Sequence, residues 1–276
     1  MRVPTWPSVS GRSALAPWAA GWAIISLVAC GSKEPTTDAD RLARGRELVQ
    51  RMSDRLAAAS AITVTTSEVR DLVRLSGAKE TVPVTSVYTI RRPDRFHAKM
   101  TGGRGLESWY NGKTVTIAGH PDKVFAQAPM PETLDRTLDA LAERYDMPLP
   151  MGDFFYGSAA HALLSDTTTG GYAGTETVNG TLCTHLSFQD VGVEWELWLP
   201  VEGDPLPRRF KVVQKSRVGR PVVDVTFTKW DFAASPPDET FKPKVPADYE
   251  GIAILQRAAA VKGASQTEPT ATAPRK

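Results

Sequence analysis

The sequence predicts a mainly β fold of the α+β class: an antiparallel incomplete barrel of about eleven strands, with a leading helix and a mid-chain helical lid. Apolar and polar residues alternate with a period of two over residues 61–125 and again over 172–227, as in half-buried strands. Asn-Gly pairs at 111–112 and 179–180 predict tight hairpins, because both central positions of that turn need a positive φ. Antiparallel neighbours joined by short turns favour a sheet that curls into a half-barrel.

Residues 1–29 predict a lipoprotein signal peptide. Arg2 and Arg12 supply positive charge, and no acidic residue precedes Cys30. The apolar run 14–29 is shorter and more interrupted than the about 20 residues that span a bilayer. The segment Leu27-Val28-Ala29 directly before Cys30 resembles a bacterial lipobox, which implies cleavage there and acyl chains on the cysteine. The alternative is a plain secretory signal followed by a chance cysteine.

An acylated Cys30 would anchor the mature chain to a membrane. Several acyl chains, at about 0.8 kcal/mol per buried methylene, anchor a protein stably where one chain does not. The expected location is the cell envelope of a Gram-negative-type bacterium, facing the periplasm, and Gly31 after the cysteine suggests the outer membrane. Residues 30–39 lack any apolar period and are expected to form a polar tether.

The composition argues against nucleic acid as a partner and against a disulfide framework. The chain carries 33 Lys and Arg against 31 Asp and Glu, and the signal peptide's two arginines account for the excess. The near-neutral mature chain lacks the clustered basic residues of nucleic-acid binders. Cys30 and Cys183 are the only cysteines, so acylation of the first leaves the second without an intramolecular partner. We expect a monomer.

A helix is expected directly after the tether. Apolar residues recur at three, four and seven positions, and Asp38 or Asp40 can cap the first turn. The opposite face is rich in arginine, which indicates either a solvated face diluted by acids or a surface that faces a membrane. The apolar stripe consists of Leu42, Leu48, Val49, Met52 and Leu56.

The strands on either side of the lid present apolar rows to a common interior. Six are expected before it, in meander order, and about five after it. Residues 251–276 are expected to form a disordered tail. The inward rows include Val84, Tyr88, Ile90, Phe96, Trp195 and Leu197.

The insert between the two sets of strands is unusually apolar. Pro129 and Pro131 end the preceding strand, and helices are expected over Glu132–Tyr145 and Asp153–Leu164. Because its apolar residues share one side, the insert would cover the opening of the barrel as a lid. The lid side chains expected to face the sheet are Leu134, Leu138, Leu141, Phe154 and Phe155.

Four short motifs follow one another in a specific order. They are an Arg-Pro-Asp turn followed by Phe (91–96), an Asn-Gly-Lys-Thr hairpin (110–115), a Pro-Asp turn (121–124) and a Phe-Lys-Pro stretch (238–243). Together they resemble the periplasmic lipoprotein carriers of the LolA/LolB type, over a domain of residues 40–250. Within that superfamily, segments 141–145, 183–186 and 206–208 resemble most a group of predicted periplasmic proteins of unknown function.

The resemblance implies an eleven-stranded half-barrel with a helical lid over an apolar cavity that takes a lipid or an acylated protein. The inward rows would then bind this ligand. In the carriers, the arginine before the motif proline contacts the lid, and that position is Arg92 here. The chain departs from the soluble carrier in its lipid anchor, and from the motif in Ala98, where the carrier has an aromatic residue.

Arg92 is the polar residue expected to hold the lid. Pro93 favours an extended backbone at Arg92, which places it at a strand end near the rim of the barrel. A guanidinium there can donate a planar fork of hydrogen bonds to carbonyl groups of the insert. The alternative is that Arg92 only solvates the turn.

No residue pattern predicts catalysis, a metal site or a cofactor. Cys183 and His185 could supply two metal ligands, but no second pair accompanies them at zinc-like spacing. The segment 102–105 lacks the third glycine of a dinucleotide-binding loop. Glu194 and Glu196 alternate to the outer face, away from any shared substrate.

Two functions are consistent with the sequence. The first is a non-catalytic binder of a hydrophobic ligand, held in a half-barrel under the lid. The second is a protein-interaction or sensor module of the cell envelope, which uses the same scaffold with a filled core. An enzyme is not expected, because no nucleophile is paired with a base.

Overall fold

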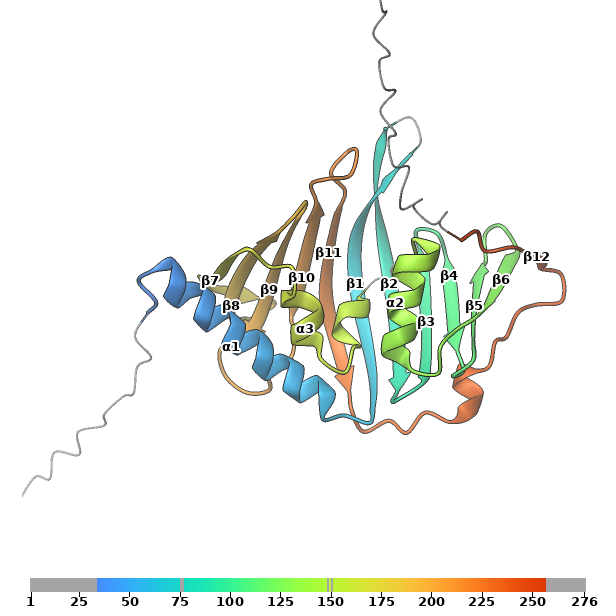
Figure 1. Cartoon of the computed structure of the whole chain (residues 1–276), viewed down its shortest axis with the longest axis horizontal. Helices are drawn as coiled ribbons and strands as arrows, with labels where there is room; N and C mark the ends of the chain where they lie inside the picture. The colour runs from blue at the N-terminus through green and yellow to red at the C-terminus, as the bar shows by residue number, and fades with distance from the viewer. Residues whose placement is uncertain (1–33, 75–76, 148, 150, 257–276) are drawn as a thin grey trace, which may run out of the picture. The chain divides into compact units, whose positions relative to one another are not determined.

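The computed structural model describes residues 34–74, 77–147, 149 and 151–256. It confirms the predicted fold class: a mainly antiparallel sheet that stays open, with a leading helix and a helical insert on one of its faces (Figure 1). We call this the inner face and the opposite one the outer face. The predicted signal peptide and Cys30 lie outside the described residues. No helix in the described ranges is long and apolar enough to cross a membrane.

The first six strands form the expected meander, in which each strand pairs antiparallel with the next. The turn at Asn111-Gly112 differs from the tight hairpin predicted, because only Gly112 has a positive φ. Asn111 instead accepts hydrogen bonds through its side-chain oxygen from the amides of Lys113 and Thr114. The strands are β1 (Ala61–Val73), β2 (Lys79–Arg91), β3 (Arg95–Gly102), β4 (Leu106–Tyr110), β5 (Thr114–Gly119) and β6 (Val124–Pro129).

Five more strands return the chain to β1. They are β7 (Thr169–Val178), β8 (Thr181–Asp190), β9 (Val193–Pro200), β10 (Arg209–Gln214) and β11 (Val222–Asp231). The β7–β8 turn has positive φ at both Asn179 and Gly180, as predicted. β11 pairs antiparallel with β1, for example at Val64 and Trp230, so that one sheet joins the two sets of strands.

A twelfth strand, β12 (Glu250–Ile252), pairs in parallel with β6. The strand order is therefore β12-β6-β5-β4-β3-β2-β1-β11-β10-β9-β8-β7. The sequence count of about eleven antiparallel strands omits β12, because its three residues are all exposed and leave no apolar alternation. The strand also carries two residues of the stretch 251–276, which was expected to be disordered.

The leading helix α1 (Asp38–Ala57) begins within the predicted tether. Its cap is Thr37 rather than Asp38 or Asp40: the Thr37 hydroxyl accepts from the Asp40 amide, and the Asp40 carboxylate accepts from the Thr37 amide. The predicted stripe, apart from the partly buried Leu42, is buried against the sheet. A Cβ on Gly45 would lie 2.7 Å from the Cα of Gly171 in β7, so the helix and strand backbones nearly touch.

The insert consists of α2 (Leu134–Tyr145), the short 3-10 helix η1 (Gly152–Phe154) and α3 (Ala159–Leu164). α2 begins two residues after the predicted start at Glu132, and Thr133 caps it. The single helix predicted over Asp153–Leu164 is two short pieces, because Ser158 takes an extended backbone and caps α3 by accepting from the His161 amide. A second 3-10 helix, η2 (Asp238–Phe241), follows β11.

Candidate functional site

The inner face of the sheet carries a largely apolar surface beneath the insert. Five of the six side chains predicted to bind a ligand belong to the same buried cluster, the sixth, Val84, is buried outside it, and none is more than 5% exposed. They come from three strands that lie far apart in the sequence: Val84, Tyr88 and Ile90 from β2, Phe96 from β3, and Trp195 and Leu197 from β9.

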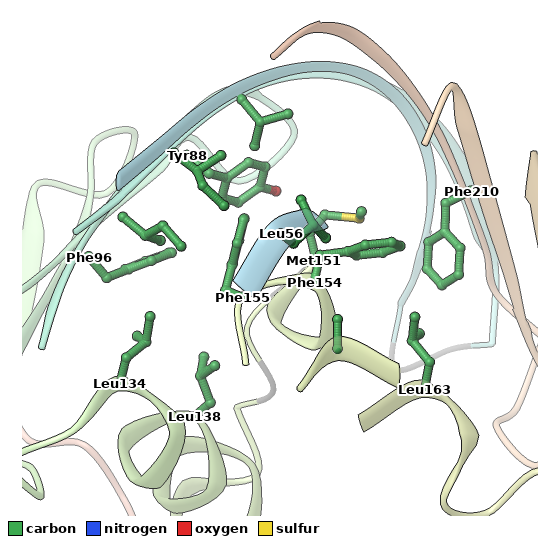
Figure 2. Packing of buried hydrophobic residues seen from close by; sticks show 14 of the residues in the cluster. Leu56, Tyr88, Phe96, Leu134, Leu138, Met151, Phe154, Phe155, Leu163 and Phe210 are labelled. Carbon is green, nitrogen blue, oxygen red and sulfur yellow. The ribbon is translucent and has the colours of Figure 1, made fainter. Parts of the chain in front are cut away.

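The insert fills the centre of this surface with its own aromatic side chains. Phe155 lies 5.5 Å from Tyr88 and 5.9 Å from Phe96 between ring centroids, and Figure 2 shows it pointing at both from below the curved strands. Phe154 packs edge-on against Phe210, at 5.0 Å. A cavity between the leucines of α2 and the sheet has a volume of only about 10 Å³. In this state the insert closes the centre of the half-barrel.

Three leucines of α2 also pack against the inner face of the sheet. Leu134, Leu138 and Leu141 are each 3% exposed or less, and the first two lie below Phe96 in Figure 2. The predicted lid residues are therefore all seated against the inner face.

Arg92, on the turn between β2 and β3, reaches the insert with both terminal nitrogens. Its Nη1 donates to the carbonyl oxygen of Phe155 at 2.9 Å, and its Nη2 to that of Tyr156 at 3.2 Å. The next residue, Pro93, accepts a hydrogen bond from the amide of Leu134 at 2.9 Å. Burial lowers the pKa of the guanidinium, an effect that the nearby Asp135 carboxylate opposes. One short turn thus binds both the start of α2 and the segment that follows η1.

A buried polar cluster, which sequence reasoning missed, interrupts the apolar inner face. The Glu68 side chain is fully buried, accepts from the hydroxyls of Thr66 at 2.6 Å and Tyr88 at 3.2 Å, and forms an ion pair with Arg70. Burial, together with this carboxylate, raises the pKa of the Tyr88 hydroxyl. The signal was present in the sequence, because Thr66, Glu68 and Arg70 continue the inward row of Ile62.

An opening of about 460 Å³ leads to the inner face at the end of β2 remote from Arg92. We call it the mouth. It lies between the ends of β1 to β4, the β10–β11 turn and the C-terminal end of α2. Its apolar lining includes Val84, Met100, Leu141 and Val223, and Arg70 also lines it. A neighbouring groove of about 770 Å³ shares part of this lining and continues beside residues 252–255.

The outer face holds two carboxylate–histidine networks. Glu107 accepts from His97 at 2.8 Å and from His120 at 2.9 Å, and His120 also contacts the Tyr249 hydroxyl at 2.8 Å. Burial opposes ionisation of Glu107, yet these two histidines and the charge of Lys99 lower its pKa to about 2. This network ties the segment before β12 to β4 and to the β5–β6 turn.

The second network concerns the pair considered as metal ligands. His185 stacks on Trp198 and bonds Glu196, whereas Cys183 is buried in a small cluster with Val178 and Trp198. Within the described residues, no three His, Cys, Asp or Glu side chains are placed to hold a metal ion together.

The paired glutamates of β9 also have structural partners. Glu194 bonds Lys215 at 2.8 Å, and Glu196 bonds Lys211 at 2.9 Å. Both carboxylates lie on the outer face, as the alternation predicts.

Comparison with known proteins gives the chain a family. The sequence matches the family described as DUF2092, predicted periplasmic proteins, over residues 45–255. No curated protein shows significant similarity. The fold is similar to that of an uncharacterized conserved protein from Thermus thermophilus, with 13% identity and a TM-score of 0.45 over 75% of this chain and 98% of that one.

Two further solved structures are similar. One is a chain of the MucA/MucB complex of Pseudomonas aeruginosa, with 16% identity and a TM-score of 0.42 over 72% of this chain and 61% of that one. The other is the lipoprotein LppX of Mycobacterium tuberculosis, with 12% identity and a TM-score of 0.40 over 69% and 96%. Since the family match spans the sheet, the insert and most of α1, this chain belongs to the DUF2092 family of predicted periplasmic proteins.

Proposed function

We propose that this protein is a non-catalytic binder of a hydrophobic ligand, a lipid or an acylated protein, on the periplasmic side of the cell envelope. The observation that carries the proposal is that the largely apolar lining of the mouth adjoins the buried apolar cluster beneath the insert. Val84 belongs to both the inward row of β2 and the lining of the mouth, and Leu141 of the lid also lines the mouth. An apolar chain that enters there first meets the apolar side chains of Val84 and Leu141, and the buried Glu68 cluster flanks its path toward Tyr88.

The insert then acts as a lid whose aromatic side chains occupy the ligand's place. Phe154 and Phe155 fill the centre in the closed state, and the polar attachment of this segment to the sheet is the pair of hydrogen bonds from Arg92. A ligand that displaces the two rings replaces one set of apolar contacts by another. The free-energy cost of opening the lid is therefore small compared with that of exposing the apolar inner face to water.

The second candidate is a protein-interaction or sensor module with a permanently filled core. The packing of Phe155 between Tyr88 and Phe96 favours it, since a close-packed interior needs no ligand. In that case the outer face and the strand edges would contact an envelope partner, and the insert would never leave the sheet.

Binding of an uncharged fluorescent hydrophobic probe, N-phenyl-1-naphthylamine, to the full-length chain tests the proposal. We expect saturable binding, and lipid recovered by solvent extraction of the purified protein. Met100→Trp should weaken probe binding by filling the mouth, whereas Val87→Trp, on the outer face of the neighbouring strand, should leave it unchanged. No extracted lipid and no probe binding would favour the interaction module.

We further propose that the mature chain is a monomer anchored to the outer membrane through acyl chains on Cys30. The proposal rests on the arginine-flanked apolar run that ends at this cysteine. Mass spectrometry of the mature amino terminus tests it. A terminal peptide that begins upstream of Cys30, or an unmodified Cys30, would exclude the anchor.

A further inference from the structure

The rim of the mouth carries arginine side chains that have no partner among the described residues. Arg104, on the β3–β4 turn, and Arg217, on the β10–β11 turn, both line the mouth, are exposed, and form no ion pair in the described part of the chain. They come from different walls of one opening. The two guanidinium groups therefore approach an anion at the rim from two different turns.

The turn that presents Arg104 is fixed on the sheet. Gly102 has a φ of +86°, and a Cβ there would lie 2.5 Å from the carbonyl oxygen of Pro83 in β2. Gly103 has a φ of +56°, and a Cβ there would lie 3.0 Å from the side chain of Val84. The Gly102-Gly103-Arg104-Gly105 segment, which is not a dinucleotide loop, thus packs closely on β2 and places Arg104 among the residues that line the mouth.

The other charges at the mouth are largely neutralised. Arg70 is matched by the buried Glu68, and Asp71 forms an ion pair with Lys79 at 3.0 Å. Among the described residues, Asp146, the left-handed cap residue of α2, is the one further carboxylate that lines the mouth. The two unpaired arginines therefore leave an excess of positive charge at the rim of an otherwise apolar entrance.

We propose that the mouth selects amphiphiles with an anionic headgroup, a carboxylate or a phosphate, which Arg104 and Arg217 bind while the apolar chain runs inward past Val84. This assignment rests on the proposed function and adds the chemistry of the headgroup. Guanidinium groups suit it, because their planar donors match carboxylate and phosphate oxygens. The volume of about 460 Å³ is in the range of small-molecule sites, about 300–1,000 Å³.

Three ligands with one apolar chain and different headgroups test the selection. Dodecanoate, dodecyl phosphate and the uncharged dodecyl maltoside, each below its critical micelle concentration, compete with N-phenyl-1-naphthylamine for the full-length chain at low salt. We expect at least one anionic ligand to bind about tenfold more tightly than the maltoside, and salt to reduce the difference. Preference for dodecanoate points to a fatty acid, and preference for dodecyl phosphate to a phospholipid headgroup.

The double variant Arg104→Gln/Arg217→Gln should lower the affinity for both anionic ligands to that for the maltoside, and leave the maltoside affinity unchanged. Arg220→Gln is the matched control, since Arg220 is an exposed arginine of the same β10–β11 turn that does not line the mouth. Equal binding of all three ligands by the wild-type chain would overturn the headgroup assignment and leave the proposed function intact. Failure of the probe and all three ligands to bind would overturn both.

Discussion

The guanidinium of Arg92 and the backbone carbonyl of Phe155 are joined by a 2.9 Å hydrogen bond across 63 positions of the sequence. The bond couples the β2–β3 turn to the residue whose ring fills the centre of the half-barrel. The same contact therefore holds the backbone of the insert and positions its aromatic side chain.

Replacement of Arg92 should loosen the insert without unfolding the sheet. Charge-assisted hydrogen bonds contribute about 1.5–3 kcal/mol each, so Arg92→Leu should speed amide hydrogen exchange in residues 151–156 at least about tenfold. Probe release should become faster as well. Arg91→Leu is the control, since Arg91 bonds Pro236 and Asp238 rather than the insert. Unchanged exchange and release in Arg92→Leu would make Arg92 only a turn residue.

Truncation of Phe155 should separate the two candidate functions. Phe155→Ala should lower the free energy of unfolding by about 3–5 kcal/mol in the absence of ligand. If the half-barrel binds a ligand beneath the insert, the same variant should bind more hydrophobic probe, and the probe should restore much of the lost stability. Phe241→Ala removes an equally buried ring outside this cluster and should lose stability with no gain in probe binding. Equal behaviour of the two variants would argue for a filled core.

The Glu107 network should make stability depend on pH in the acid range. Because the folded-state pKa of about 2 lies below the ordinary value of 4.5, the stabilisation is complete above the ordinary value and is lost as the pH falls toward 2. Glu107→Gln should therefore cost on the order of 2 kcal/mol at neutral pH and flatten the acid dependence. Urea unfolding as a function of pH measures both effects, with the exposed Glu47→Gln as control. A parallel pH profile in Glu107→Gln would contradict this origin.

The contact between α1 and β7 should not accept a side chain at Gly45. A methyl group there meets the Cα of Gly171 at 2.7 Å and the ring of Phe188 at 2.9 Å. Overpacking of this kind costs about 1–3 kcal/mol, more than the about 1 kcal/mol that alanine gains over glycine in a helix. Gly45→Ala should therefore lower the thermal midpoint, whereas Arg46→Ala, exposed on the same helix, should not. A raised midpoint in Gly45→Ala would show that the helix can shift away from β7.

The sequence predicted those parts of the structure that depend on local periodicity. Alternation with a period of two placed Tyr88 and Trp195 on the inner face, and the apolar stripe placed Leu138 against the sheet. The Thr37 cap was missed, because several neighbouring polar residues can fill that role and only the backbone geometry selects one. β12 was missed because exposed residues carry no periodic signal.

The candidate site was less predictable than the fold. The inward rows were identified. The packing of Phe155 against Tyr88 was not, because the two residues are far apart in the sequence and meet only through the path of the insert. The mouth is assembled from turns whose sequences carry no common pattern, such as those of Arg104 and Arg217. Glu68 could have been found from its inward position, which requires a polar partner for a buried carboxylate.

The pairing of β1 with β11 bears on how the chain reaches this structure. Thr63 lies opposite Asp231, so the ladder joins residues 168 positions apart, and the two sets of strands form one sheet only once both have been synthesised. Contacts this distant in sequence slow folding, because the loop must close before they stabilise anything. Until then, β1 and β11 each present an edge of unpaired backbone N–H and C=O groups. Folding therefore depends on late closure of the pairing between β1 and β11, and until it closes these two strands are free to pair with another chain.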